Sequence, residues 1–266
     1  MPIVIMLVSA FAIIGLVKYG LVPGIDRASA SLGWSLKARG KATGYATSVP
    51  ELVTLVAAGL SGVWEAGLWN IASSNIINVS LATAALLVYR RGRDLFNRRF
   101  VKELSFAGLG IIAPLLLMQL QLDQHPSVVL VLLLCFGVYL WVDTSDGEVP
   151  EDQYGDDNGP MGAVFLCLFS LGLIAVAGNF LGSATRDVVQ TMGVPAIAAG
   201  WILGVVTSLP EAVTFFEVFS TKRAGETPNR KAQIQELLDN LAASNMSNSG
   251  LIYPLGLGIF LLGTAW

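Results

Sequence analysis

The sequence predicts an all-α membrane protein of about eight transmembrane helices, arranged in two halves of inverted topology. Three observations lead to this fold class. The 266-residue chain is 54% hydrophobic and only 13% charged, whereas soluble domains carry roughly 25% charged residues. Its apolar runs approach or exceed the ~20 residues that a membrane-spanning helix needs. Two of these runs contain the same Thr-Ser-x-Pro-Glu sequence.

Eight apolar runs meet the length requirement for a transmembrane helix. The first run has no Lys or Arg before Lys18, so it lacks the basic start of a secretory signal and is interpreted as a transmembrane helix. The predicted spans are residues 2–20, 33–60, 66–89, 104–121, 126–142, 161–181, 191–219 and 237–265.

The distribution of basic residues predicts the orientation of these spans. Lys and Arg gather near three connections, which follow the first, third and seventh spans: Lys18, Arg27, Lys37, Arg39 and Lys41; Arg90, Arg91, Arg93, Arg98, Arg99 and Lys102; Lys222, Arg223, Arg230 and Lys231. With the N-terminus outside, all three connections are cytoplasmic, as the positive-inside rule requires. We therefore expect an integral protein of the cell (inner) membrane with its N-terminus outside.

The connection between the fifth and sixth spans, "DTSDGEVPEDQYGDDNGP", is acidic and has no basic residue. It divides the chain into a first half, 1–142, an acidic cytoplasmic linker, 143–160, and a second half, 161–266. A calcium-sensing loop is the alternative interpretation of the linker. The spacing of its acidic residues does not match an EF-hand, so we interpret the segment as a solvated linker.

Two short motifs occur once in each half. The first is Thr-Ser-x-Pro-Glu, and the second follows it as "NIASSNIIN" or "NLAASNMSN". The matched residues are Thr47, Ser48, Pro50 and Glu51 with Thr207, Ser208, Pro210 and Glu211, and Asn70, Ser74, Asn75 and Asn78 with Asn240, Ser244, Asn245 and Asn248. The second span is expected to run outward and the seventh inward, so the copies form an inverted repeat. Transporters built from inverted repeats bind their substrate near the membrane midplane.

Each Pro-Glu pair places unpaired oxygen atoms at membrane depth. Pro50 has no N–H to bond the Ala46 carbonyl, and Pro210 has none for Val206. Glu51 and Glu211 follow directly, and no Lys or Arg is available deep in the spans to neutralise them. Two carboxylates, two carbonyls and the hydroxyls of Thr47, Ser48, Thr207 and Ser208 form an all-oxygen set that suits a hard cation such as calcium.

The second motif provides neutral oxygens for the same site. Asn70, Ser74 and Asn78 are spaced four residues apart, so they share one face of the third span. The matched residues Asn240, Ser244 and Asn248 share one face of the eighth span. Such small polar residues also hold membrane helices together without binding an ion. Because two matched stripes accompany two matched Pro-Glu pairs, we favour the cation site.

The two motifs together resemble the alpha repeats of the cation/calcium exchanger superfamily, in particular sodium/calcium exchangers. The resemblance covers Gly44 to Asn78 (repeat 44–78) and Gly204 to Asn248 (repeat 204–248). It implies that Glu51 and Glu211 bind calcium and sodium in turn, with hydroxyls matching Thr47, Ser48, Ser74, Thr207, Ser208 and Ser244 and carbonyls matching Ala46 and Val206. It also implies that the first and sixth spans slide as a gate, to which the glycines of 172–182 would contribute.

Three features depart from the family pattern. Asn248 stands where many relatives have an acidic residue, so the site holds two carboxylates. Trp69 and Asp239 replace the glycine that usually precedes the second motif, and Asp239 adds a charge near the cytoplasmic entrance. The second half has three spans where relatives have five. A naturally short form, a fragment and a homodimer that covers the exposed face all remain open.

The sequence thus predicts a secondary antiporter that exchanges calcium for sodium across the lipid bilayer. Protons are an alternative coupling ion, because a carboxylate in a medium of low dielectric constant can be protonated near neutral pH. A cation-binding membrane subunit without transport is the second alternative. No Walker motif or nucleophile constellation occurs, so we expect no enzymatic activity. We also expect no cofactor and no nucleic-acid partner.

Overall fold

The computed structural model describes residues 1–31, 45–46, 48–92, 95, 97–144, 160–220 and 230–264. In this part of the chain the regular elements are helices, and no residue lies in a strand. They are α1 (Pro2–Leu16), η1 (Val17–Leu21), α2 (Val22–Ser31), α4 (Val49–Leu60), α5 (Trp64–Val88), η3 (Arg98–Phe100), α6 (Val101–Gln119), α7 (Pro126–Thr144), α8 (Pro160–Arg186), η4 (Asp187–Thr191), α9 (Ala196–Thr207), α10 (Leu209–Ser220), α11 (Arg230–Ser247), η5 (Asn248–Ile252) and α12 (Tyr253–Thr264).

Among the described residues, seven helical segments are long and apolar enough to cross a membrane. They are Pro2–Ile25, Trp64–Val88, Arg98–Gln119, Pro126–Asp143, Met161–Thr191, Ala196–Phe216 and Gln233–Gly263. They correspond to the first and the third to eighth predicted spans, so the prediction of an all-α membrane protein is confirmed. Only the end of the second predicted span, the apolar helix Val49–Leu60, is described. Most of the acidic linker lies outside the described residues.

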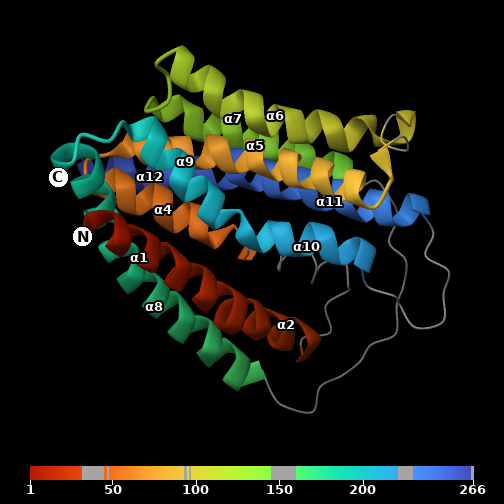
Figure 1. The fold of residues 1–266 in the computed structure, drawn as a ribbon, viewed down its shortest axis with the longest axis horizontal. Coiled ribbons are helices and arrows are strands. Elements are labelled where there is room, and N and C mark those ends of the chain that lie inside the picture. Colours follow the sequence, from red (N-terminus) through yellow and green to blue (C-terminus); the bar gives the residue numbers. More distant parts are fainter. Residues whose placement is uncertain are drawn as a thin grey trace.

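The helices form two groups (Figure 1). α1 and α2 pack along α8 on one side of the molecule, while the remaining helices form a larger bundle beside them. The N-terminus and the last described helix, α12, lie at one end of the bundle. The connection between α5 and α6 lies at the opposite end. Ile13, Leu181 and Leu203 belong to one buried apolar cluster, which joins the α1/α8 group to α9.

Helix α9 packs directly on the backbone of α5, because small residues line their contact. A Cβ added at Gly200 would meet the Trp69 Cβ and would lie 2.8 Å from the Ala66 carbonyl oxygen. A Cβ added at Gly204 would meet the Ser73 hydroxyl. Glycine therefore allows the closest approach of these helices. This approach brings the end of α9 against the polar stripe of α5.

Candidate functional site

Both Pro-Glu motifs interrupt the helical path at equivalent serines. Ser48 precedes α4 with φ −86° and ψ 1°, and Ser208 lies between α9 and α10 with φ −82° and ψ 2°. The sequence predicts a weakened helix at each proline, and the structure begins a new helix one residue before it. The reason is that Pro50 and Pro210 then fall in the first turn, where a helix needs no N–H donor.

This arrangement places Glu51 and Glu211 in the first turns of α4 and α10. The Glu51 residue is 0% exposed and the Glu211 residue 4% exposed. The Glu51 carboxylate lies close to the hydroxyls of Ser74 and Thr207 and interacts electrostatically with Glu211, and the Glu211 carboxylate lies close to Ser244. None of the four carboxylate oxygens has a hydrogen-bond partner among the described residues. The positive end of each short helix partly compensates the charge.

A network of amides fixes the orientation of Asn78 in α5. Asn245 in α11 donates through Nδ2 to the carbonyls of Asn75 (3.2 Å) and Ala107 (3.1 Å), so its Oδ1 is an acceptor. The Asn78 Nδ2 faces this oxygen at 3.4 Å and also donates to the Ser244 hydroxyl at 3.1 Å. The Asn78 Oδ1 must therefore point the other way, and it has no hydrogen-bond partner.

The orientation of the Asn248 amide also follows from its hydrogen bonds. Asn75 donates through Nδ2 to the Gly110 carbonyl (2.8 Å) and the Ser249 hydroxyl (2.9 Å), which leaves its Oδ1 as the acceptor. Asn248 donates to this oxygen at 2.9 Å. Its own Oδ1 consequently points away from Asn75 and is buried without a partner. Asn78 and Asn248, which are matched in the two repeats, thus each present one free oxygen.

Eight of the unpaired buried oxygens among the described residues occur in pairs at matched positions of the two repeats. They are the hydroxyls of Ser48 and Ser208, both carboxylate oxygens of Glu51 and Glu211, and the Oδ1 atoms of Asn78 and Asn248. A buried polar atom without a partner costs about 1–3 kcal/mol, and more if it is charged, so such groups seldom go unpaired. A cation can bond oxygens of all three kinds.

The other predicted hydroxyls bond within the protein. The Ser74 and Thr207 hydroxyls lie 3.2 Å apart, and Thr207 donates to the Asn70 Oδ1 at 3.2 Å. The Ser244 hydroxyl accepts from Asn78. These bonds join α5 to α9 and to α11, so they hold the two repeats together beside the carboxylates. All three hydroxyls remain able to bond an ion through a free lone pair.

The backbone carbonyls of Ala46 and Val206 belong to buried residues just before the two interruptions, with 3% and 6% of the residue exposed. Thr47 lies outside the described residues. Within the described part of the chain, no three His, Cys, Asp or Glu side chains gather closely enough to hold a metal ion. A cation here would depend on the two glutamates together with neutral oxygens, a combination that suits calcium and sodium better than a transition metal.

Sequence reasoning missed the two residues that orient the site, Asn75 and Asn245. Both belong to the repeated second motif, but each directly follows the serine of the stripe and so points away from it. Repetition alone was the available signal. Thr54, one turn after Glu51, was also missed, and its buried hydroxyl has no partner among the described residues.

One known protein family matches the chain. The model of the family described as "Sodium/calcium exchanger protein" matches residues 2–144, more than half of the chain. The chain belongs to this family. Neither the curated proteins nor the solved structures compared with the chain give a match. Family membership and seven membrane-length helices identify the chain as an integral membrane protein of a cation-transporter family.

Proposed function

We propose that this member of the sodium/calcium exchanger family exchanges calcium for sodium by alternating access, with Glu51 and Glu211 as the charged ligands. The observation that carries the proposal is the set of unpaired buried oxygens at matched positions of the two repeats. The remaining proposed ligands are the hydroxyls of Thr47, Ser48, Ser74, Thr207, Ser208 and Ser244, the amide oxygens of Asn78 and Asn248, and the carbonyls of Ala46 and Val206.

The charge of this set explains how one site serves both ions. Two ionised glutamates give the site a charge of −2, which one calcium ion or two sodium ions neutralise. Either occupancy avoids a large uncompensated charge in a medium of low dielectric constant. The two ions therefore compete for the site. A third sodium ion would leave the occupied site positive and would make transport electrogenic.

The fold supports alternating access. In Figure 1, α4 and α10 run in opposite directions along the bundle, as an inverted repeat would require. The basic connection between α5 and α6 lies at the end opposite the N-terminus. We therefore assign the N-terminus to the outside of the cell (inner) membrane and this connection to the cytoplasm. The halves 1–142 and 161–266, joined by the linker 143–160, would then be the inverted units.

The α1/α8 group is the proposed moving element, because it lies beside the bundle and contacts α4 through small residues. A Cβ added at Gly178 would lie 2.5 Å from Val53 Cγ1, and one added at Gly182 would lie 2.5 Å from the Ala57 carbonyl oxygen. Both contacts are on the helix that carries Glu51. A sliding movement of α8 along this glycine-lined surface would therefore alter the surroundings of the site directly.

The decisive experiment measures calcium uptake into proteoliposomes that contain the purified protein. Three conditions are compared: an outward sodium gradient, an outward proton gradient, and no gradient. We expect uptake that requires the sodium gradient and is lost in Glu51→Gln and Glu211→Gln. Uptake driven by the proton gradient alone would mean that protons, and not sodium ions, are the coupling ions. Folded protein that binds calcium but gives no uptake under any gradient would instead indicate a cation-binding membrane subunit.

A further inference from the structure

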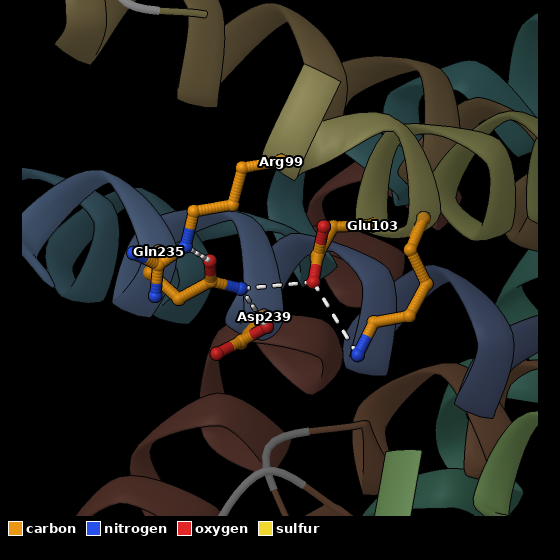
Figure 2. A network of polar contacts seen from close by, with 5 residues as sticks. Arg99, Glu103, Gln235 and Asp239 are labelled. Atoms are coloured by element: carbon orange, nitrogen blue, oxygen red, sulfur yellow. Dashed lines mark hydrogen bonds and ion pairs between the residues drawn. The ribbon is translucent and has the colours of Figure 1, made fainter. Parts of the chain in front are cut away.

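A second group of oxygens lies between α6 and α11 (Figure 2). The Gln235 side chain donates through a single nitrogen, Nε2, to two carboxylates: Glu103 Oε1 at 2.8 Å and Asp239 Oδ1 at 2.9 Å. Two negative groups from different helices are thus within reach of one atom. A neutral amide holds them together, although it carries no charge to offset theirs.

Glu103 is the unusual member of this group. Its side chain is only 4% exposed, and its second oxygen, Oε2, is buried with no hydrogen-bond partner among the described residues. One oxygen of this carboxylate, Oε1, faces Gln235 on α11 (Figure 2). A buried carboxylate oxygen without a donor is costly unless a ligand satisfies it. Asp239, in contrast, is exposed and gives the group access to solvent.

Negative side chains outnumber positive ones around this group. Lys102 Nζ lies 3.5 Å from Glu103 Oε1. The guanidinium of Arg99 donates through Nε to Gln235 Oε1 at 3.2 Å, and thus contacts the amide instead of the carboxylates. Asp143, at the end of α7, adds a third negative charge that interacts electrostatically with Asp239. The local field therefore favours a cation despite the neighbouring lysine.

We propose that Glu103, Asp239 and Gln235 form a second binding site, separate from Glu51 and Glu211, for a hard divalent cation such as calcium. The cation would bond the two carboxylates that the Gln235 Nε2 now holds. Rotation of the Gln235 amide would direct its Oε1 to the ion, and the exposed Arg99 would then bond water. Water would complete the six to eight oxygens that calcium takes.

The position of this site gives it a role in ion entry. Asp239 lies five residues before Ser244 on α11, which is about 7.5 Å along a helix axis. Glu103 lies near the start of α6, at the end of the bundle that the proposed orientation assigns to the cytoplasm. A calcium ion held there would be close to the route toward Glu211. The binding site itself does not depend on the proposed exchange; only its cytoplasmic location does.

The test uses full-length protein in which Glu51→Gln and Glu211→Gln are combined, so that the central carboxylates no longer contribute. Binding of radioactive calcium to this purified, folded variant is measured at equilibrium. We expect residual binding that weakens at least about tenfold on adding Asp239→Asn or Glu103→Gln, because calcium affinity follows the number of charged ligands. Lys102→Met should have the opposite effect and tighten binding several-fold, because it removes the nearest competing cation.

Glu236→Gln is the matched control, because Glu236 is an exposed carboxylate beside Gln235 on the same helix. It should leave the residual binding unchanged. Equal weakening by Glu236→Gln and Asp239→Asn would indicate diffuse attraction by surface charge and would overturn the proposal. Absence of residual binding in the folded double variant would overturn it as well. Neither result bears on transport by the unmodified protein, so the two proposals fail independently.

Discussion

The two copies of the Thr-Ser-x-Pro-Glu motif are alike in backbone and differ in their surroundings. The φ and ψ angles of Ser48 and Ser208 agree within a few degrees, and the glutamate that follows each has two unpaired buried oxygens. The second motif that follows the first copy lies in α5, a continuous helix of 25 residues. The second motif that follows the second copy begins in α11, which changes to a π-helix at Asn248.

The difference is largest at the position before the second motif, where family members usually have glycine. In the first copy, Trp69 lies against Gly200 and donates to the Glu65 carboxylate at 3.3 Å. In the second copy, the equivalent Asp239 accepts from Gln235, which is itself equivalent to Glu65. Each copy therefore keeps a polar pair one turn apart. In the first pair the Trp69 indole donates to the carboxylate, whereas in the second pair the Asp239 carboxylate is exposed.

This contrast separates two kinds of constraint. Features shared by both copies are those that cation binding would require, namely the interrupted helix, the glutamate and the amide oxygen without a hydrogen-bond partner. Features that differ lie farther along the helices, toward opposite ends of the bundle. In the proposed alternating-access mechanism the two ends would face different solutions, so nothing would require them to match.

The largest expected effect is loss of calcium binding in Glu51→Gln or Glu211→Gln. Each variant leaves one carboxylate to neutralise a doubly charged ion, at a cost of about 3 kcal/mol or ~100-fold in affinity. Without calcium, each variant should unfold at a higher temperature than the unmodified protein, because one of two neighbouring buried charges is gone. Calcium-dependent thermal unfolding of the detergent-solubilised protein measures both effects.

The two variants should agree within about threefold in affinity, because both glutamates occupy the first turn of a short helix and lack partners. Glu65→Gln is the control, since Glu65 is exposed, and it should retain the affinity of the unmodified protein. A variant at Glu51 or Glu211 that keeps its calcium affinity would mean that this copy of the motif does not contribute a ligand.

The second effect concerns the close packing of α5 on α9. Gly200→Ala would push a methyl group against Trp69 and toward the Ala66 carbonyl, so we expect a loss of about 1–3 kcal/mol in the free energy of unfolding. Adding Trp69→Gly should restore only part of this stability, because the Ala66 carbonyl remains 2.8 Å from the new Cβ. Denaturation followed by circular dichroism measures these differences.

Gly258→Ala is the matched control, since a Cβ there would have no neighbour within 4 Å. It should be neutral or stabilise the protein by up to about 1 kcal/mol, because alanine favours the helix. If Gly200→Ala were tolerated as well as Gly258→Ala, the two helix backbones would not be in contact. The contact of Trp69 with Gly200 would then need another explanation.

The sequence predicts most of the spans, because length and apolar composition determine which segments enter a membrane. It also predicts the residues of the site that repeat in the chain. It does not predict where the amides of Asn78 and Asn248 point, because that depends on the carbonyls of Ala107 and Gly110. Both carbonyls belong to α6, and neither repetition nor spacing in the sequence identifies α6 as a partner.

A smaller effect is expected from the amides of Asn78 and Asn248, whose Oδ1 atoms have no hydrogen-bond partner. Asn78→Ala and Asn248→Ala each remove one neutral oxygen, so calcium affinity should fall about tenfold, or ~1.4 kcal/mol. Equal losses would support matched roles in the two repeats, and titration of calcium binding measures them. Ser80→Ala, at an exposed position of α5, is the control and should have no effect. Full affinity in either Asn variant would limit its amide to a structural role.

The smallest effect distinguishes two threonines that occupy equivalent positions, one turn after each glutamate. Thr214 donates to the Glu211 carbonyl at 2.9 Å, whereas the buried hydroxyl of Thr54 has no partner among the described residues. Thr214→Val should therefore cost about 0.5–1.5 kcal/mol of stability, while Thr54→Val should be neutral or stabilising, because it removes an unsatisfied polar atom. Thermal unfolding without calcium tests both expectations. Calcium affinity then supplies the sharper distinction: if Thr54→Val lowers it while Thr214→Val does not, the Thr54 hydroxyl is an ion ligand that the second repeat lacks, and the site is less symmetric than its motifs.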